Sequence, residues 1–219
     1  MSWRNMLGVC IVTAGLLAGL ATAEDKKPPA KPEKPQDVAT EPPGGEDSNA
    51  MMEMWMKLAA PGEHHEHLKV LAGKWEVSGK MRMAPEAPWE ESKSTIETEW
   101  ILGGRFLVQR VKGEPMPPIE TPFEGFALIG YDNGIQKYTA VWADNMGTMM
   151  MTAQGTCTAD GKEITLEGAY ENPMTKSKDP FKWVYRIKGP DEYVMEGRMN
   201  GPDGKEFVNL ELTHKRAKG

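Results

Sequence analysis

The stretch "HLKVLAGKWEVSGKMRM", residues 67–83, changes its hydrophobic period at Gly73. Before this glycine, Leu68 and Leu71 are spaced as on one face of a helix. After it, apolar or small residues alternate with polar ones, at Trp75, Val77, Gly79, Met81 and Met83. A period of two places successive side chains on opposite faces of a strand. The stretch therefore predicts a short helix over 63–71 that leads into a strand with one face in the core.

Nine further segments repeat this alternation, from "STIETEW" at 94–100 to "EFVNLELTH" at 206–214. Short turn signals separate several of them: "DNG" at 132–134, "ADG" at 159–161, "GPDE" at 189–192 and "GPDG" at 201–204. Such residues accept the positive φ angles of tight hairpin turns. Ten amphipathic strands in series predict an antiparallel up-and-down barrel, because closure removes the exposed strand edges. We therefore expect an all-β fold with a short N-terminal helical lead-in.

The N-terminal part of the sequence indicates export. Residues 1–23 combine Arg4, an uncharged and largely apolar stretch, and the small-residue ending "ATA". This is the pattern of a secretory signal peptide. An uncleaved membrane anchor is the alternative, because the apolar run is just long enough to span a bilayer. We expect cleavage after Ala23, a periplasmic or extracellular protein, and no membrane span in the mature chain. The sequence does not indicate an oligomeric state.

Two regions follow the predicted signal peptide. Residues 24–49 are rich in proline and charge and contain almost nothing apolar, which predicts a disordered linker. The barrel domain then covers 50–219 and begins with a helix over 51–60. Four apolar residues of this helix fall on one stripe, Met51, Met54, Trp55 and Leu58. We expect the stripe to pack on the barrel rather than to bind copper.

Charge and cysteine content exclude several kinds of partner and bond. The chain has 32 acidic and 26 basic residues, and loss of residues 1–23 would remove one basic residue and no acidic one. This excess of negative charge argues against binding to nucleic acid or to anionic lipid. Cys10 would leave with the signal peptide, so Cys157 would remain without a partner for an intramolecular disulfide.

Several groups of residues, in this order, resemble one bacterial family: "HLKVLAGKW", "ILGGRFLVQ", "FEGFALIGYD" with "KYTAVWAD", and "FVNLELTHKR". This family is domain of unknown function 1579, and the resemblance covers roughly residues 64–216. It implies a lipocalin-like (calycin-type) barrel with a short helix that closes one end. It implies no activity, since none is established for the family. The "LxGxW" opening and the strand count are also similar to nitrobindin, a ten-stranded haem-binding barrel, although the glycine-rich continuation typical of nitrobindins is absent after Trp75.

Three histidines stand together just before the first strand. His64 and His67 are three residues apart, so on a helix they share a face and are candidate ligands of one metal ion. A third ligand would have to come from a neighbouring glutamate or a distant strand. The alternative is that His65 and His67 are solvated flanks of a helix whose inward residues are leucines.

His214 is the second candidate for chemistry. It continues a period-two series on the last strand, after Val208, Leu210 and Leu212, so we expect it to point into the barrel near one mouth. The haem histidine of nitrobindin also lies on the closing strand, so the resemblance makes haem the cofactor candidate for His214. The alternative is a hydrogen-bonded histidine that plugs the end of the barrel.

The sequence best predicts a binding protein. We expect a small, mostly apolar molecule in the barrel mouth, beside Trp75, Trp100, Trp142, Tyr185 and His214. An enzyme of unknown chemistry in the same cavity is the first alternative, using Asp144, Arg110 or His214. A structural envelope protein with a filled barrel and no ligand is the second. No nucleophile elbow, phosphate-binding glycine loop or zinc-protease motif supports a particular reaction, and Asp144 could equally tie a strand end to Arg105 or Arg110.

Overall fold

The computed structural model of the protein describes residues 45–115 and 120–218. The predicted signal peptide and most of the predicted linker lie outside the described residues. Three helices come first, namely α1 (Gly45–Ala59), α2 (Glu63–Leu68) and the 3₁₀ helix η2 (Lys69–Leu71). Among the helices described, none has both the length and the apolar character needed to cross a membrane.

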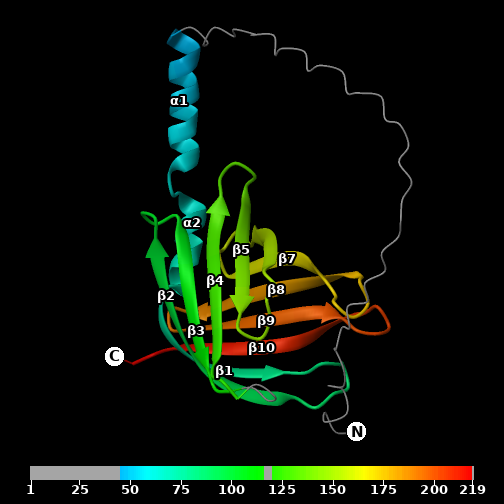
Figure 1. Cartoon of the computed structure of the whole chain (residues 1–219). Coiled ribbons are helices and arrows are strands. Elements are labelled where there is room, and N and C mark those ends of the chain that lie inside the picture. Colours follow the sequence, from blue (N-terminus) through cyan, green and yellow to red (C-terminus); the bar gives the residue numbers. More distant parts are fainter. Residues whose placement is uncertain (1–44, 116–119, 219) are drawn as a thin grey trace, which may run out of the picture. The chain divides into compact units, whose positions relative to one another are not determined.

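The rest of the chain forms a closed antiparallel barrel of ten strands (Figure 1). The strands are β1 (Gly73–Met81), β2 (Glu90–Ile101), β3 (Phe106–Gly113), β4 (Phe123–Asp132), β5 (Lys137–Asp144), β6 (Met151–Cys157), β7 (Glu163–Glu171), β8 (Lys178–Gly189), β9 (Glu192–Asn200) and β10 (Glu206–Arg216). Each strand pairs with the next in sequence, and β1 pairs with β10. The predicted ten-stranded up-and-down barrel is therefore confirmed.

The hairpin turns follow the predicted chemistry. At the β4–β5 turn, the Asp132 carboxylate accepts hydrogen bonds from the backbone N–H groups of Gly134 and Ile135. At the β6–β7 turn, Gly161 has a φ of +71°, and at the β9–β10 turn Gly204 has a φ of +76°. Glycine adopts these angles without the steric cost of a side chain. These local preferences keep consecutive strands adjacent.

The helices α2 and η2 plug one end of the barrel, as the family resemblance implies. Leu68 and Leu71 are at most 1% exposed and belong to the main core. The indole N–H of Trp75 donates to the Leu71 carbonyl oxygen at 3.0 Å. Arg216, at the end of β10, donates to the Ala72 carbonyl oxygen at 3.1 Å. We call this the capped end. It contains the first residues of the odd-numbered strands and the last residues of the even-numbered ones.

No described helix covers the opposite end, which we call the open end. Several inward-facing apolar side chains toward this end are only partly buried, whereas Phe181 is buried. The partly buried ones are Phe123, Trp142, Met151, Trp183, Met195 and Leu212. Nearer the capped end, Ile129 and Ile164 are at most 2% exposed, and Leu166, which pairs with the partly exposed Trp183, is completely buried. Solvent thus reaches some inward-facing side chains toward the open end, while neighbours such as Phe181 stay buried.

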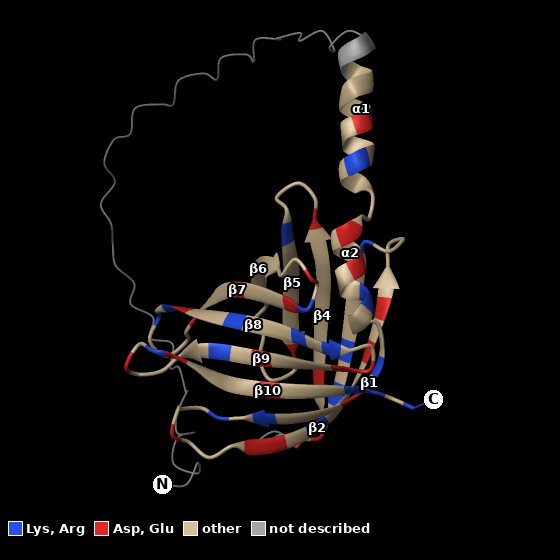
Figure 2. Ribbon diagram, turned by 180° about the vertical axis from the view of Figure 1, so that it is seen from behind, with Lys and Arg blue, Asp and Glu red and all other residues tan. Residues whose placement is uncertain are grey.

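The prediction that the first helix packs on the barrel is wrong. Helix α1 begins at Gly45, inside the predicted linker, and its apolar stripe is exposed, with Trp55 64% exposed. Figure 2 shows that most of the described residues of α1 are neither acidic nor basic. The amide of Asn133 donates to the carbonyl oxygens of Leu58 and Ala60, which ties the end of the helix to the β4–β5 turn. The four apolar residues do share one face of the helix, as their spacing predicts, but this face is exposed instead of packed on the barrel.

The register of β10 also corrects one detail of the predicted inward face. The pairing with β9 shifts between Val208 and Leu210, so Val208 pairs with Arg198 while Leu210 pairs with Gly197. Because successive residues of β9 point to opposite faces, Val208 and Leu210 point to opposite faces as well. Leu210, Leu212 and His214 share the inward face, and Val208 does not.

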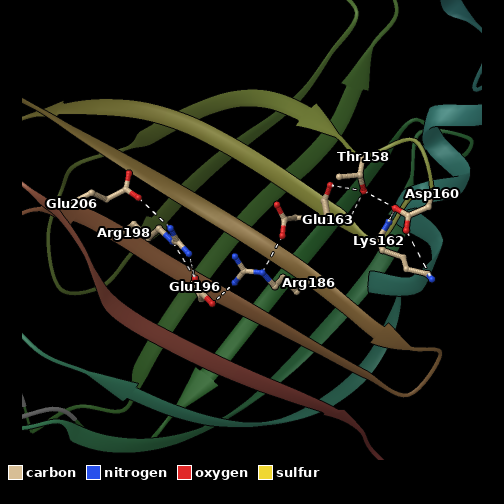
Figure 3. Close-up of polar contacts among 8 residues, drawn as sticks. All are labelled: Thr158, Asp160, Lys162, Glu163, Arg186, Glu196, Arg198 and Glu206. Carbon is tan, nitrogen blue, oxygen red and sulfur yellow. Dashed lines mark hydrogen bonds and ion pairs between the residues drawn. The ribbon is translucent and has the colours of Figure 1, made fainter.

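Ion pairs cross the outer face of the last strands (Figure 3). Arg186 of β8 pairs with Glu163 of β7 and Glu196 of β9, and Arg198 pairs with Glu196 and with Glu206 of β10. This chain of charges runs from the capped end of β7 to the open end of β10. It links four strands on the outside while apolar residues pack within.

Candidate functional site

An aromatic cluster inside the capped end brings together three of the predicted ligand-lining residues. Tyr193 lies at its centre and is completely buried. The His214 ring stacks on it at 3.9 Å between centroids, and the Trp75 ring meets it edge-on at 4.8 Å. Tyr185 lies 6.5 Å away on the neighbouring strand. Strand register explains the cluster, because Tyr193 pairs with His214 across β9 and β10.

His214 points inward, as predicted, and is 2% exposed. It lies at the capped end, so α2 and η2 separate it from bulk water. Burial lowers the pKa of His214 from its ordinary value of 6.5 to about 4. The ring is therefore neutral near pH 7, and one of its nitrogens lies 3.1 Å from the Leu212 carbonyl oxygen. It can exchange hydrogen bonds with a ligand but offers no positive charge.

Among the described residues, two buried hydroxyl groups inside the barrel lack a hydrogen-bond partner, those of Thr98 and Tyr193. Both are near Gln109. Thr98 pairs with Gln109 in the β2–β3 register, and Gln109 is the polar side chain beside the Tyr193 hydroxyl, although the geometry of a good hydrogen bond is not met. Burial raises the pKa of Tyr193 well above its ordinary value, so this hydroxyl stays a donor. A buried polar group without a hydrogen-bond partner lowers the stability of the folded protein. The two hydroxyl groups therefore mark a place inside the barrel where a hydrogen-bonding group is missing.

A row of inward residues connects this polar level to the accessible part of the inner face. Register places Thr98, Gln109, Ala127 and Trp142 side by side across β2, β3, β4 and β5. With about 4.8 Å between strands, the row spans roughly 14 Å. Trp142 is partly buried, and a side chain on Gly125 would meet its ring at 2.4 Å. The absence of a side chain at Gly125 therefore leaves room for the indole in this position.

The other predicted ligand-lining residue, Trp100, lies outside this row. It is partly buried, near the capped end of β2, and pairs with Leu107. The structure thus groups Trp75, Tyr185 and His214 at the capped end, places Trp142 toward the open end, and leaves Trp100 on a separate level.

The residues considered for catalysis do not converge. Asp144 accepts a hydrogen bond from the Trp142 indole N–H at 2.7 Å and another from the Met146 backbone N–H. Arg110 is exposed and pairs with Glu99 across β2 and β3. Asp144 ends β5 at the open end, whereas His214 lies at the capped end. This arrangement brings no acid, base and nucleophile together.

The histidines before β1 meet a tyrosine of the barrel. Tyr138 of β5 places its hydroxyl oxygen 2.7 Å from His67 Nδ1 and 3.4 Å from His64 Nδ1. The expectation of a solvated His65 is wrong, because His65 is 5% exposed and its Nδ1 accepts a hydrogen bond from the Gly62 backbone N–H. Within residues 45–115 and 120–218, no three His, Cys, Asp or Glu side chains are grouped so as to hold a metal ion.

The surroundings of His214 do not fit a haem. Its ring lies flat against Tyr193, and both side chains are almost completely buried. Trp75 and the capping helices close the same end. An iron porphyrin on His214 would have to displace Tyr193, so no role is assigned to haem here.

Two hollows lie on the outside of the barrel, away from the inner face. One of about 440 Å³ is lined by Ser78, Lys80, Lys93, Glu211 and their neighbours on β1, β2 and β10. The other, of about 400 Å³, lies at the β8–β9 turn. Their walls carry charges of both signs and the orphan hydroxyls are not among them, so we place the candidate site inside the barrel.

Comparison with known proteins places the chain in a family. Residues 60–216 match the family model described as "Protein of unknown function (DUF1579)". The chain belongs to this family. Among solved structures, the DUF1579 barrel is similar to the crystal structure of Rv2717c from M. tuberculosis, with a TM-score of 0.53 and 17% sequence identity over 73% of this chain and 100% of that chain. At this identity the likeness concerns the fold alone.

A redesigned beta barrel also matches, with a TM-score of 0.37 and 11% identity over 69% of this chain and 96% of that one. Comparison with curated proteins gives no match. The comparisons thus establish the family and the fold of this DUF1579 member and assign no ligand.

Sequence reasoning missed Tyr193, Thr98 and Gln109. Each lies in a segment predicted as a strand, and period two places Tyr193 on the same face as Met195 and Gly197. The signal that could have identified Thr98 and Gln109 is a polar residue at an inward position of the alternation. Such positions in a predicted barrel deserve the same weight as histidines.

Proposed function

We propose that this DUF1579 barrel binds a small, mostly apolar molecule with one uncharged polar group on its inner face, reached from the open end. The observation that carries the proposal is the pair of buried hydroxyls without partners, Thr98 and Tyr193, joined to an accessible apolar wall. In line with residues 1–23, we also propose that the protein acts after export from the cytoplasm.

The wall suits an apolar ligand. Trp142, Met151, Trp183 and Met195 face inward and are partly exposed, so a ligand that covers them removes apolar surface from water. Aromatic and methionine side chains provide a large and adaptable contact surface. Binding sites of this kind are mostly apolar and carry a few polar groups that orient the ligand.

The polar level favours an uncharged group. Thr98, Gln109 and Tyr193 offer hydroxyl and amide groups, and His214 is neutral because burial lowers its pKa to about 4. The guanidinium of Arg216 is already engaged by the Ala72 and Pro190 carbonyl oxygens and by Asp191. A carboxylate at this level would be desolvated without a matching charge, whereas a carbonyl or hydroxyl could satisfy the orphan groups.

The neutral fluorophore N-phenyl-1-naphthylamine tests the proposal with the full chain. We expect its emission to rise on binding to the wild type and the rise to be lost in Ala127→Phe, which fills the row between Gln109 and Trp142. The matched control is Leu128→Phe, one residue further on the outer face. Circular dichroism confirms that both variants fold. Absence of binding to the wild type, or equal binding to both variants, contradicts the proposal.

Tyr193→Phe tests the polar level separately. It removes one oxygen and leaves the aromatic packing with His214 and Trp75 in place. We expect the protein to be at least as stable as the wild type, because a buried group without a partner is removed. A fatty alcohol that displaces the fluorophore from the wild type should do so less well from the variant, and unchanged displacement argues against a polar contact at Tyr193.

A further inference from the structure

The three rings of His64, His67 and Tyr138 surround one point at the surface of the capped end. Their centroids form a triangle with sides of 5.8, 6.0 and 6.4 Å. The two Nδ1 atoms lie 3.4 and 2.7 Å from the Tyr138 oxygen. Three nitrogen and oxygen atoms that could ligate an ion therefore face one another. The histidines come from α2 and the tyrosine comes from β5.

The hydrogen bonding at this point depends on the histidine tautomers. The Tyr138 hydroxyl can donate its one hydrogen to one Nδ1 atom and can accept a hydrogen bond from the other when that histidine carries its hydrogen on Nδ1. Burial raises the pKa of Tyr138, and the Cys157 side chain is hydrogen-bonded to it, so a cation that binds the Tyr138 oxygen has to displace the hydroxyl proton to solvent. A metal cation accepts several lone pairs at once, and imidazole nitrogens suit Zn²⁺ and Cu²⁺. When both imidazoles carry their hydrogen on Nε2, both Nδ1 lone pairs and the Tyr138 oxygen can face one cation.

Neighbouring groups hold both imidazoles in place. The His64 ring stacks on Tyr131 at 4.2 Å between centroids. The His67 ring packs against the β6–β7 turn, where a side chain on Gly161 would come within 3.0 Å of it. Contacts of this kind orient the ligands of a metal site before the ion arrives. His64 is exposed, so an ion can enter from solvent and keep a position open for water.

We propose that His64 and His67 bind a divalent transition-metal ion through their Nδ1 atoms, with the Tyr138 oxygen as third ligand. The pair of histidines is one short of a complete ligand set when only His, Cys, Asp and Glu are counted, and Tyr138 completes it. Because the ligands come from α2 and β5, the ion cross-links the plug to the barrel wall. The site is independent of the ligand proposed inside the barrel.

Titration of the untagged full chain with Cu²⁺ tests the site. We expect one equivalent to bind, an electron paramagnetic resonance spectrum with two nitrogen ligands, and a visible charge-transfer band from the tyrosine oxygen. Bound Cu²⁺ should raise the melting temperature, because it holds α2 on the barrel. His64→Ala and His67→Ala should each abolish these effects.

Tyr138→Phe separates a built site from an adventitious one. It removes a single oxygen, and we expect affinity for Cu²⁺ to fall about tenfold and the visible band to vanish. His65→Asn is the matched control, since it keeps an acceptor for the Gly62 N–H and should bind Cu²⁺ like the wild type. If Tyr138→Phe does not fold, the charge-transfer band of the wild type decides. Unchanged affinity in Tyr138→Phe, or a wild type without the band and the melting shift, shows an adventitious ion only and overturns the proposal.

Discussion

The two ends of the barrel are built from the same alternating strands but differ in how they treat their inner face. At the capped end, Leu68 and Leu71 close the interior, and Trp75 and Tyr193 are at most 1% exposed. Toward the open end, Trp142 and Trp183 occupy equivalent inward positions and remain partly exposed. The alternation along each strand determines whether a side chain points into the barrel. Whether that side chain is also shielded from solvent depends on the helices α2 and η2, which cover only one end. Trp75 and Tyr193 are therefore better shielded from solvent than Trp142 and Trp183.

Trp75→Ala should have the largest effect on this difference. The indole is 1% exposed, donates to Leu71, contacts Tyr193 and lies under the Arg216 guanidinium at 4.3 Å. We expect the free energy of unfolding to fall by about 3–5 kcal/mol, as for other buried aromatic residues. Urea denaturation followed by circular dichroism measures the change. A loss below about 1 kcal/mol would mean that the plug does not depend on Trp75.

The capped end should also give the protein its acid sensitivity. Burial lowers the pKa of His214 to about 4, so between pH 6.5 and 4 the unfolded chain binds a proton that the folded chain resists. The contribution of His214 to stability is complete above about pH 6.5 and decreases by about 3 kcal/mol as the pH falls to 4. Tyr185 and Tyr193 beside it have raised pKa values and do not titrate in this range.

Unfolding by urea at several pH values between 4 and 7 tests this expectation. His214→Gln should remove about 3 kcal/mol of the decrease. Burial also lowers the pKa of His65, so a smaller decrease should remain in the variant. If wild type and His214→Gln lose stability equally over this range, the acid sensitivity lies elsewhere.

At the open end, a tryptophan should matter less. Trp183 faces inward beside Phe181, 4.8 Å away between centroids, but solvent already reaches it. We expect Trp183→Ala to cost about 1–2 kcal/mol, because only part of its surface is removed from water on folding. Urea denaturation of both variants gives the loss in the free energy of unfolding for Trp183→Ala relative to that for Trp75→Ala. A cost equal to that of Trp75→Ala would show that the two ends are equally sealed.

The smallest effect is expected on the outer face. Glu196 joins Arg186 and Arg198, but both arginine side chains are 29% exposed, so solvent weakens the pairs. Glu196→Gln should lower the free energy of unfolding by less than about 1 kcal/mol, and the difference should shrink at high salt. Melting curves at low and high salt measure it. A larger, salt-independent loss would indicate that the chain of ion pairs in Figure 3 holds the strands together more than the interior does.

The architecture could be predicted because its signals are local. Alternation and turn residues identified all ten strands, and the period change at Gly73 identified the plug. Gly73 has a φ of +117°, and a side chain there would lie 2.5 Å from the Arg216 guanidinium. The glycine therefore permits both the turn into β1 and the close approach of β10, and only the first of these reasons is visible in the sequence.

The candidate site was less predictable because it depends on register. Which residue faces His214 depends on the pairing of β9 with β10, and that pairing contains a shift at Val208. No local pattern reports such a shift, so Tyr193 was missed and Val208 was placed on the wrong face. The meeting of His64 and His67 with Tyr138 joins residues about 70 positions apart. Helical spacing could identify the two histidines but not the tyrosine that faces them.

The uncovered methionines of α1 have a chemical consequence. Met51, Met52, Met54 and Met56 are each at least 49% exposed, and oxidants convert exposed thioethers to sulfoxides. On α1 this change makes an exposed helix more polar and disturbs no core. Met151 and Met195, on the inner face of the barrel, are better shielded. Under oxidative stress the methionines of α1, together with the exposed Met83, Met150 and Met174, should therefore be modified before Met151 and Met195.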